Sequence, residues 1–113
     1  MCTEQQISII TRRIAALAKT VFGEKLRSVI LYGSYARGDY DEESDVDIMI
    51  LVNIPREELW HYKDPITKLT SELGLEHDAV IIATLKDTET FDAYLDAMPF
   101  YQNVQKEGIP IAV

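Results

Sequence analysis

The sequence predicts a small α/β or α+β domain in which helices flank one mixed sheet of three or slightly more strands. Two observations support this fold class. Short β-prone runs alternate with longer segments whose apolar residues recur every three or four positions, the period of a helix with one buried face. The 113 residues are 47% apolar and 27% charged, enough for one hydrophobic core, and no repeat or low-complexity linker divides them. Residues 1–113 are therefore expected to form a single domain.

The first half of the chain predicts one helix and two strands. Apolar residues recur at helical spacing over 7–21, and Gly23 follows as a stop signal. The run 28–32 is a short β-prone segment. Residues 46–52 form a second such run, apolar on both faces after its first residues, which is typical of a strand buried on both sides. The linker 33–43 contains two glycines, a stretch able to form one helical turn, and acidic residues.

The second half predicts further helices and a third strand. Pro55 suits the first turn of a helix, and apolar residues then recur at helical spacing as far as Leu73, with Gly74 as the expected end. Pro65 lies inside this pattern, so a kink or two shorter helices are expected there. Residues 77–83 have the composition of a buried strand. Two helical segments are expected to close the chain, at 91–98 and 99–107.

Composition and charge exclude several classes of protein. Nineteen acidic residues against eleven basic ones give a net charge of −8, whereas a protein that holds long nucleic acid needs clustered Lys and Arg. The longest aliphatic run, at 48–52, is too short to span a bilayer. The N-terminus lacks the pattern of a signal peptide, and the single Cys2 has no partner within the chain. A cytoplasmic protein with no membrane or nucleic-acid partner is expected.

Asp45 and Asp47 stand at the start of the second predicted strand. Because alternate strand residues point to the same face, their carboxylates are expected side by side. Two such carboxylates repel each other, and a bound divalent cation would compensate. Oxygen ligands of this kind suit Mg²⁺ or Mn²⁺, which commonly bridge to the phosphates of a substrate. The alternative is a solvated loop, because six carboxylates crowd into residues 39–47.

Gly33 and Ser34 follow the first predicted strand directly. Glycine lets the backbone turn sharply and approach a ligand, and serine can cap a short helical turn. Free N–H groups at such a turn attract phosphate, although a capped turn without a ligand is the alternative. Ten residues separate Ser34 from Asp45. The first pair ends one strand and the second begins the next, which is the context that a joint phosphate and metal site requires.

The segment GSYARGDYDEESDVD, residues 33–47, resembles the signature of the DNA polymerase beta-like nucleotidyltransferase superfamily. The nearest branch is the minimal nucleotidyltransferases, which are single small domains, many of them paired with a HEPN-domain ribonuclease toxin in toxin–antitoxin modules. The resemblance implies the nucleotidyltransferase fold over the whole chain, although only this segment carries a specific motif. It implies that Gly33 and Ser34 form the nucleotide-phosphate turn and that Asp45 and Asp47 are the paired metal ligands.

The resemblance also implies a third carboxylate and a mechanism. The third metal ligand of the family comes from a neighbouring strand, and Asp78 is the only acidic residue within the third predicted strand. Two Mg²⁺ ions on these three carboxylates would promote in-line attack on the α-phosphate of ATP. Asp78 would receive the proton of the acceptor hydroxyl, or else be an ordinary polar residue at a strand start. Arg37 would contact the triphosphate or, equally, Asp39 or Asp41.

The activity implied by the resemblance is transfer of AMP from ATP to a hydroxyl of a cognate HEPN toxin, with tyrosine as the acceptor, so that the chain acts as an antitoxin. A homo- or hetero-oligomer is compatible with the sequence, which does not specify the oligomeric state. A basic toxin would suit the acidic chain. Two alternatives stay open. One is a non-catalytic module that covers the active site of the toxin, with Trp60, His61 and Tyr62 as candidate contacts. The other is nucleotidyl transfer to a small molecule such as an aminoglycoside.

Overall fold

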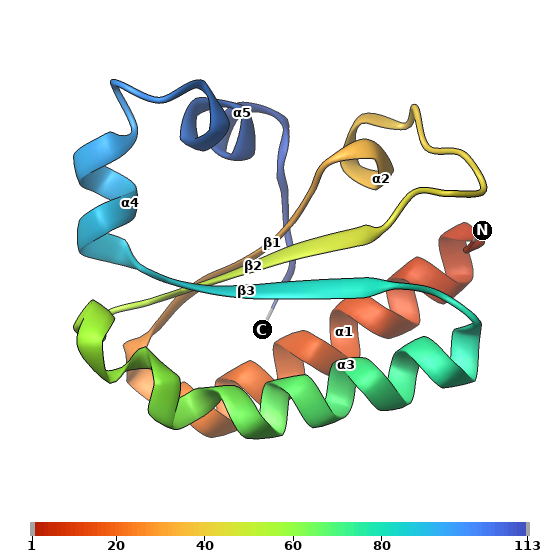
Figure 1. Ribbon diagram of the computed structural model, residues 1–113, viewed down its shortest axis with the longest axis horizontal. Helices are drawn as coiled ribbons and strands as arrows, with labels where there is room; N and C mark the ends of the chain where they lie inside the picture. Colours follow the sequence, from red (N-terminus) through yellow and green to blue (C-terminus); the bar gives the residue numbers. More distant parts are fainter. Residues whose placement is uncertain (1, 113) are drawn as a thin grey trace.

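Four strands form one mixed sheet in the computed structural model, which describes residues 2–112 (Figure 1). The strand order is β3-β2-β1-β4, with β2 antiparallel to β1 and parallel to β3, and with β4 antiparallel to β1. The mixed α/β class predicted from the sequence is confirmed. The strands are β1 (Leu26–Tyr32), β2 (Val46–Val52), β3 (Ile81–Asp87) and the short β4 (Ile109–Pro110).

Two long helices, α1 (Glu4–Phe22) and α3 (Lys63–His77), cover one face of the sheet (Figure 1). Thr3 begins α1 with a capping box: its hydroxyl accepts the backbone N–H of Gln6 at 3.1 Å, and the Gln6 side chain accepts the backbone N–H of Thr3 at 2.9 Å. The main core lies between these helices and the sheet, and its fully buried members include Ile10, Ile14, Val29, Ile48, Ile50 and Leu73. None of the helices within residues 2–112 has the length and apolarity needed to cross a membrane.

The other face of the sheet is covered only in part. A second, smaller core joins this face to α4 (Thr88–Tyr94) and α5 (Pro99–Glu107), through residues that include Ile30, Met49, Leu51, Phe91, Tyr101 and Val104. Since α4 packs against the end of β3 and α5 packs against β1, the start of β3 is open, and Val80 just before it is 60% exposed. The one-turn helix α2 (Ser34–Arg37) stands above the opposite end of the sheet (Figure 1).

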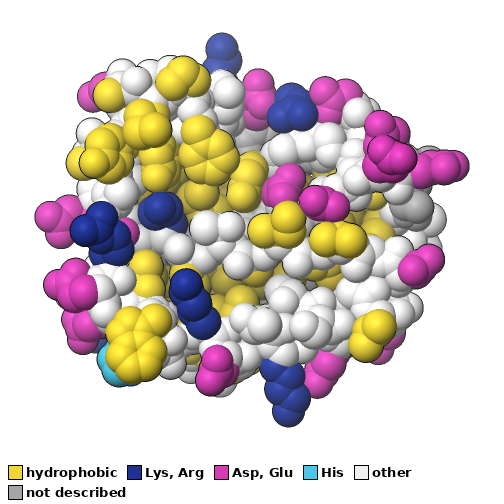
Figure 2. Space-filling model, in the orientation of Figure 1, with side chains coloured by type: hydrophobic (Ala, Val, Ile, Leu, Met, Phe, Trp, Pro, Cys, Tyr) yellow, Lys and Arg dark blue, Asp and Glu magenta, His cyan; other side chains and the backbone are white. Residues whose placement is uncertain are grey.

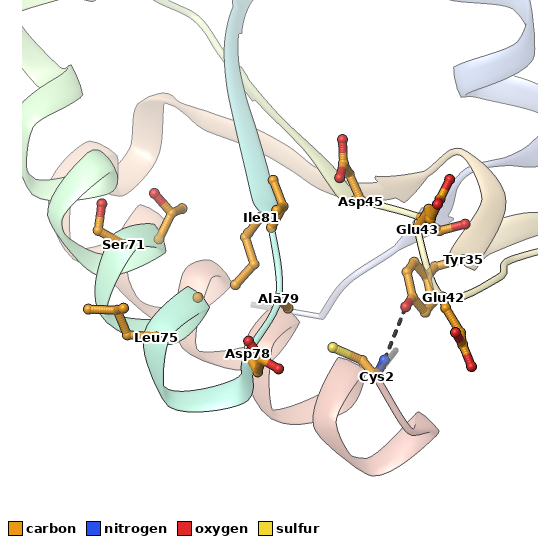
Figure 3. A pocket seen from close by; sticks show the side chains of 14 residues that line it. Cys2, Tyr35, Glu42, Glu43, Asp45, Ser71, Leu75, Asp78, Ala79 and Ile81 are labelled. Carbon is orange, nitrogen blue, oxygen red and sulfur yellow. Dashed lines mark hydrogen bonds between the residues drawn. The ribbon is translucent and has the colours of Figure 1, made fainter.

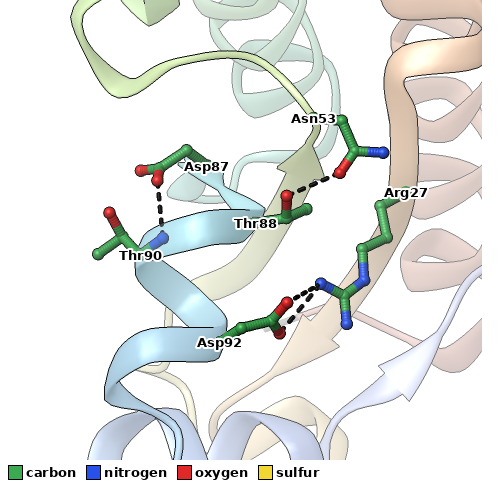
Figure 4. A network of polar contacts seen from close by, with 6 residues as sticks. All are labelled: Arg27, Asn53, Asp87, Thr88, Thr90 and Asp92. Carbon is green, nitrogen blue, oxygen red and sulfur yellow. Dashed lines mark hydrogen bonds and ion pairs between the residues drawn. The ribbon is translucent and has the colours of Figure 1, made fainter.

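Polar contacts fix α4 to the neighbouring strands (Figure 4). The hydroxyl of Thr88 donates a hydrogen bond to the side-chain oxygen of Asn53 at 2.7 Å. Arg27 on β1 pairs with Asp92 on α4 at 2.9 Å. These contacts lie at the end of the sheet away from α2. This end of the face is therefore covered by a helix, α4, that is fixed to the strands.

The predicted strand at 77–83 is placed too early. Asp78 ends α3 in the left-handed conformation, with φ 49° and ψ 54°, and β3 begins only at Ile81. Because a left-handed residue interrupts the extended chain, the alternation of β3 does not reach back to Asp78. At its other end, β3 continues parallel to β2 until Asp87 pairs with Val52.

Gly74 does not end the preceding helix, as the sequence suggested, but lies inside it. A Cβ at Gly74 would approach the carbonyl oxygen of Ala79 to 2.8 Å, and the backbone N–H of Ala79 donates to the carbonyl of Gly74 at 2.9 Å. The glycine thus lets the chain fold back closely onto α3. The predicted break near Pro65 is confirmed, since a 3₁₀ segment, η2 (Arg56–Tyr62), precedes α3 and the proline falls in the first turn.

Candidate active site

The turn from β1 into α2 depends on Gly33. Its φ of 77° lies in the region that favours glycine. A Cβ at this position would lie 2.5 Å from Oδ2 of Asp47, so the carboxylate of β2 lies directly against the backbone of the turn. The carbonyl of Gly33 accepts the N–H groups of Ala36 and Arg37, both at 3.1 Å. Backbone conformation and the approach of Asp47 therefore require glycine independently.

Ser34 begins α2 directly after this turn, where the sequence placed the phosphate-facing segment. The carbonyl of Ser34 accepts the N–H of Gly38 at 2.9 Å, which closes the single helical turn. The first N–H groups of a helix have no acceptor within it, so those of Ser34 and Tyr35 are available to an anion at the open end of the sheet. The buried Tyr35 ring stacks on Tyr40 at 4.5 Å and holds the turn in place.

Asp45 and Asp47 flank the first residue of β2. Asp47 pairs with Tyr32 on β1 and with Ile82 on β3, so these three side chains share one face of the sheet. Burial raises the pKa of Asp47, and the negative charge of Asp45 raises it further, while Arg37 acts in the opposite direction. The two carboxylates therefore lie close enough to repel each other, an arrangement that a divalent cation would stabilise.

Arg37 is engaged by two acidic side chains. Its Nε lies 3.1 Å from Oδ2 of Asp39, and its Nη1 lies 3.6 Å from Oε2 of Glu107 at the end of α5. The hydrogen bond to Asp39 and the charge of that residue raise the pKa of the guanidinium. Of the two acidic partners expected from the sequence, the structure shows Asp39; Asp41 instead accepts the backbone N–H of Glu43 at 2.9 Å.

Asp78 lies apart from the other two predicted carboxylates. It lines a cavity of about 740 Å³ together with Cys2, Glu43, Asp45 and Ile81. Figure 3 shows the Asp45 carboxylate pointing away from Asp78, which lies beside Cys2 at the other end of the cavity. Within residues 2–112, no three Asp, Glu, His or Cys side chains gather in an arrangement that could hold a metal ion.

The register of the sheet explains this separation. Ile82, and not an acidic residue, occupies the position on β3 that pairs with Asp47. Asp78 belongs to the turn before the strand, so the expectation that it would face Asp47 from an adjacent strand is not met by this geometry. Its role as a metal ligand stays a prediction.

Sequence reasoning missed Tyr32 as a neighbour of the site. Tyr32 pairs with Asp47, and its ring contacts Phe100 on α5 edge-on, with 5.8 Å between the centroids. Burial raises the pKa of Tyr32; a hydrogen bond with the Thr84 side chain lowers it, and the charge of Asp47 raises it. The position of Tyr32 directly before Gly33 could have indicated from the sequence that it borders the site. Its contact with Phe100 could not, because that contact depends on the tertiary fold.

Comparison with known proteins shows similarity over most of the chain. Residues 13–101 match the nucleotidyltransferase domain family. A relative from Methanocaldococcus jannaschii that carries the name protein adenylyltransferase is 41% identical over 83 residues, which cover 73% of this chain and 81% of the relative. A second relative of the same name and organism is 36% identical over 90 residues, covering 80% of this chain and 82% of its own length.

Solved structures share the fold at low sequence identity. A structure described as a minimal nucleotidyltransferase has a TM-score of 0.59 at 19% identity, over 95% of this chain and 94% of its own. A chain from a double Asp-to-Glu variant of the toxin–antitoxin complex MntA–HpeT has a TM-score of 0.52 at 19% identity, over 88% of this chain and 70% of its own. These similarities extend to the arrangement of the sheet and its flanking helices.

Proposed function

The chain belongs to the nucleotidyltransferase domain family, and we propose that it transfers AMP from ATP to a tyrosine hydroxyl of a HEPN-domain ribonuclease toxin and so acts as an antitoxin. Relatives named protein adenylyltransferase support a protein as the acceptor. A fold neighbour from a toxin–antitoxin complex supports the antitoxin role. The HEPN toxin and the tyrosine acceptor are carried over from the resemblance of residues 33–47.

One observation carries the proposal. The carboxylate of Asp47 lies against the backbone of Gly33, at the turn where Ser34 begins α2. Groups suited to a divalent cation therefore lie beside N–H groups suited to a phosphate, at the open end of the sheet. A nucleoside triphosphate that carries its own cation would meet both sets of groups at once.

Asp45 and Asp47 fit a divalent metal ion. They are partly buried oxygen donors; burial raises the pKa of Asp47 most and the charge of Asp45 raises it further, and a cation would relieve both effects. We expect Asp45 and Asp47 to hold Mg²⁺, which would offset negative charge on the transferred phosphoryl group and activate the acceptor oxygen. The second Mg²⁺ ion and the ligand role of Asp78 are part of this proposal.

The remaining residues hold the reacting groups. The tyrosine oxygen forms a bond to the α-phosphorus, the bond from that phosphorus to the oxygen bridging to the β-phosphate breaks, and pyrophosphate leaves. The N–H groups at Ser34 and Tyr35 would bind phosphate oxygens. Arg37, which is exposed, would contact the departing pyrophosphate from its position beside Asp39. The hydroxyl proton of the tyrosine would pass to Asp78.

The test is to incubate the purified protein with Mg-ATP and a HEPN toxin and to measure the intact mass of the toxin. We expect mass to be added in units of AMP, and we expect Asp45→Asn and Asp47→Asn each to abolish the addition. Asp92→Asn is a matched control, because this exposed carboxylate pairs with Arg27 at the other end of the sheet. That variant should transfer AMP at the normal rate.

Other outcomes identify the alternatives. Toxin neutralisation that survives Asp45→Asn and Asp47→Asn, without any added mass, would replace the proposal with a non-catalytic binding module. Pyrophosphate release that requires an aminoglycoside and no protein acceptor would replace it with transfer to a small molecule. For the third carboxylate, unchanged transfer by Asp78→Asn would remove Asp78 from the catalytic site and leave it as the cap of α3.

A further inference from the structure

We infer that Phe100 and Ile82 form the surface that binds the nucleobase of the nucleotide. This inference rests on the proposed function, because it takes the triphosphate to lie against Asp47 and the turn at Gly33. It adds a base-binding site formed by side chains that the family motif at residues 33–47 does not include.

The first step is the row of side chains around Asp47. Tyr32, Asp47 and Ile82 pair across three neighbouring strands and share the face of the sheet opposite α1 and α3. Ile82 is 43% exposed, because α4 packs over the other end of β3 and α5 packs over β1. The Asp47 carboxylate is therefore bordered by an aromatic side chain on one strand and an exposed aliphatic side chain on the other.

The second step is the position of Phe100 at the start of α5. Its ring meets Tyr32 edge-on at 5.8 Å and an angle of 88°, and it meets Tyr101 edge-on at 5.2 Å and 82°. Two edge-to-face contacts hold this ring, yet Phe100 is 47% exposed. Figure 2 shows hydrophobic side chains gathered over α4 and α5 on one part of this surface, with acidic side chains beside them toward α2.

The third step is the chemistry of the occupant. A nucleotide has an anionic triphosphate joined through one ribose to a flat base with apolar faces. With the triphosphate at Gly33 and Asp47, one ribose lets the base reach side chains that border this row, and Phe100 and Ile82 offer exposed apolar surface on either side of Asp47. Stacking on an aromatic ring suits any base, and loss of such a ring typically weakens binding by about 5- to 150-fold.

The experiment measures binding of Mg-ATP and of Mg-tripolyphosphate by calorimetry, so that base and phosphate contributions are separated. Phe100→Ala should weaken Mg-ATP binding at least about fivefold and leave Mg-tripolyphosphate binding unchanged, and Phe100→Trp should retain Mg-ATP binding. Ile9→Ala is the matched control, because Ile9 is also 47% exposed but lies on α1, on the other side of the sheet. It should change neither affinity.

A second variant tests the same site in case Phe100→Ala does not fold. Ile82→Ala, on the strand edge, should weaken Mg-ATP binding about two- to fivefold and leave Mg-tripolyphosphate binding unchanged. The inference is overturned if Phe100→Ala and Ile82→Ala leave Mg-ATP binding unchanged, if they weaken both ligands equally, or if they reduce only binding to a protein partner.

The wild-type protein separates this inference from the proposed function. Binding of Mg-tripolyphosphate as tight as that of Mg-ATP would overturn the base site and keep the proposed triphosphate site. Binding of neither compound would overturn both.

Discussion

At the scale of single residues, Asp47 links the two halves of the candidate site. Its carboxylate lies against Gly33; burial raises its pKa most, the negative charge of Asp45 raises the pKa further, and Arg37 lowers it without reversing the rise. Holding a partly buried carboxylate next to a second negative charge lowers the free energy of unfolding, whereas an exposed aspartate would have no such cost. We interpret this cost as the consequence of holding a cation-binding group at the turn.

The pKa of Asp47 gives a prediction for stability. Because this pKa is raised in the folded state, the contribution of Asp47 is most favourable below the ordinary pKa of aspartate and is lost as the pH rises through the raised value. Without Mg²⁺, Asp47→Asn should therefore raise the free energy of unfolding at pH 7 by a few tenths to about 1 kcal/mol. The gain should shrink as the solution is acidified. Urea unfolding at several pH values tests this; a less stable variant at pH 7 would contradict it.

Gly33 gives a second prediction at this scale. Gly33→Ala adds a Cβ at 2.5 Å from the Asp47 carboxylate and places alanine at a φ of 77°. We expect a loss of about 2–4 kcal/mol in the free energy of unfolding, together with loss of nucleotide binding. Gly38→Ala is the matched control, because its φ is 89° but no atom lies within 4 Å of the added Cβ. It should cost only about 1–2 kcal/mol.

The comparison of the two glycine variants tests what Gly33 requires beyond a left-handed backbone. Gly38, with ψ 7°, lies in the left-handed region that alanine can enter, whereas Gly33, with ψ −155°, lies where essentially only glycine is found and also faces Asp47. The difference between the two losses in free energy of unfolding therefore reports the extra backbone cost and the steric conflict at Gly33 together. Equal losses in the two variants would mean that Asp47 moves away at no cost and that the turn does not depend on its position.

At the scale of elements, helix propensity and packing oppose each other in α3. Gly74 lies in the helix interior, where alanine would ordinarily stabilise by about 1 kcal/mol. The added Cβ would, however, lie 2.8 Å from the backbone oxygen of Ala79, which cannot move without shifting the turn into β3. Gly74→Ala should therefore lower the free energy of unfolding by about 1–2 kcal/mol. Ser71→Ala, at an exposed position of the same helix, should be neutral or slightly stabilising.

The elements that could be predicted from the sequence are those specified by local patterns. β2 was predicted with its observed bounds, because seven residues without a glycine or proline are buried on both faces. The start of β3 could not be predicted, because it depends on how closely the chain folds back at Gly74. The two-residue β4 is defined only by its pairing with Ile30 and Leu31, far away in the sequence.

In the candidate site, too, some features follow from local sequence patterns and others depend on the tertiary fold. Period-two alternation placed Asp45 and Asp47 together, and the end of β1 placed Gly33 beside them. The partner of Arg37 at Glu107 and the contact of Phe100 with Tyr32 arise from the docking of α5, which no local pattern specifies. The resemblance of residues 33–47 to the nucleotidyltransferases is confirmed by the family match over residues 13–101.

At the scale of the whole molecule, charge decides how an anionic nucleotide can bind. The net charge is −8, and the carboxylates of Asp39, Asp41, Glu42 and Glu43 are exposed in the loop that leads to the site. Such a field opposes a free triphosphate. Binding of ATP should therefore depend on a divalent cation far more than on general screening by salt.

This dependence can be measured without any acceptor. Mg²⁺ that binds only the folded protein, at about ten times its dissociation constant, stabilises by about 1.4 kcal/mol and so should raise the melting temperature by several degrees. We expect this rise in the wild-type protein, its reversal by EDTA, and no rise in the Asp45→Asn/Asp47→Asn double variant. KCl at matched ionic strength controls for screening, because screening alone would affect both proteins alike. If Mg²⁺ still raises the melting temperature of the double variant, the cation binds elsewhere. If Mg²⁺ also fails to raise the melting temperature of Asp78→Asn, the third carboxylate belongs to the cation site.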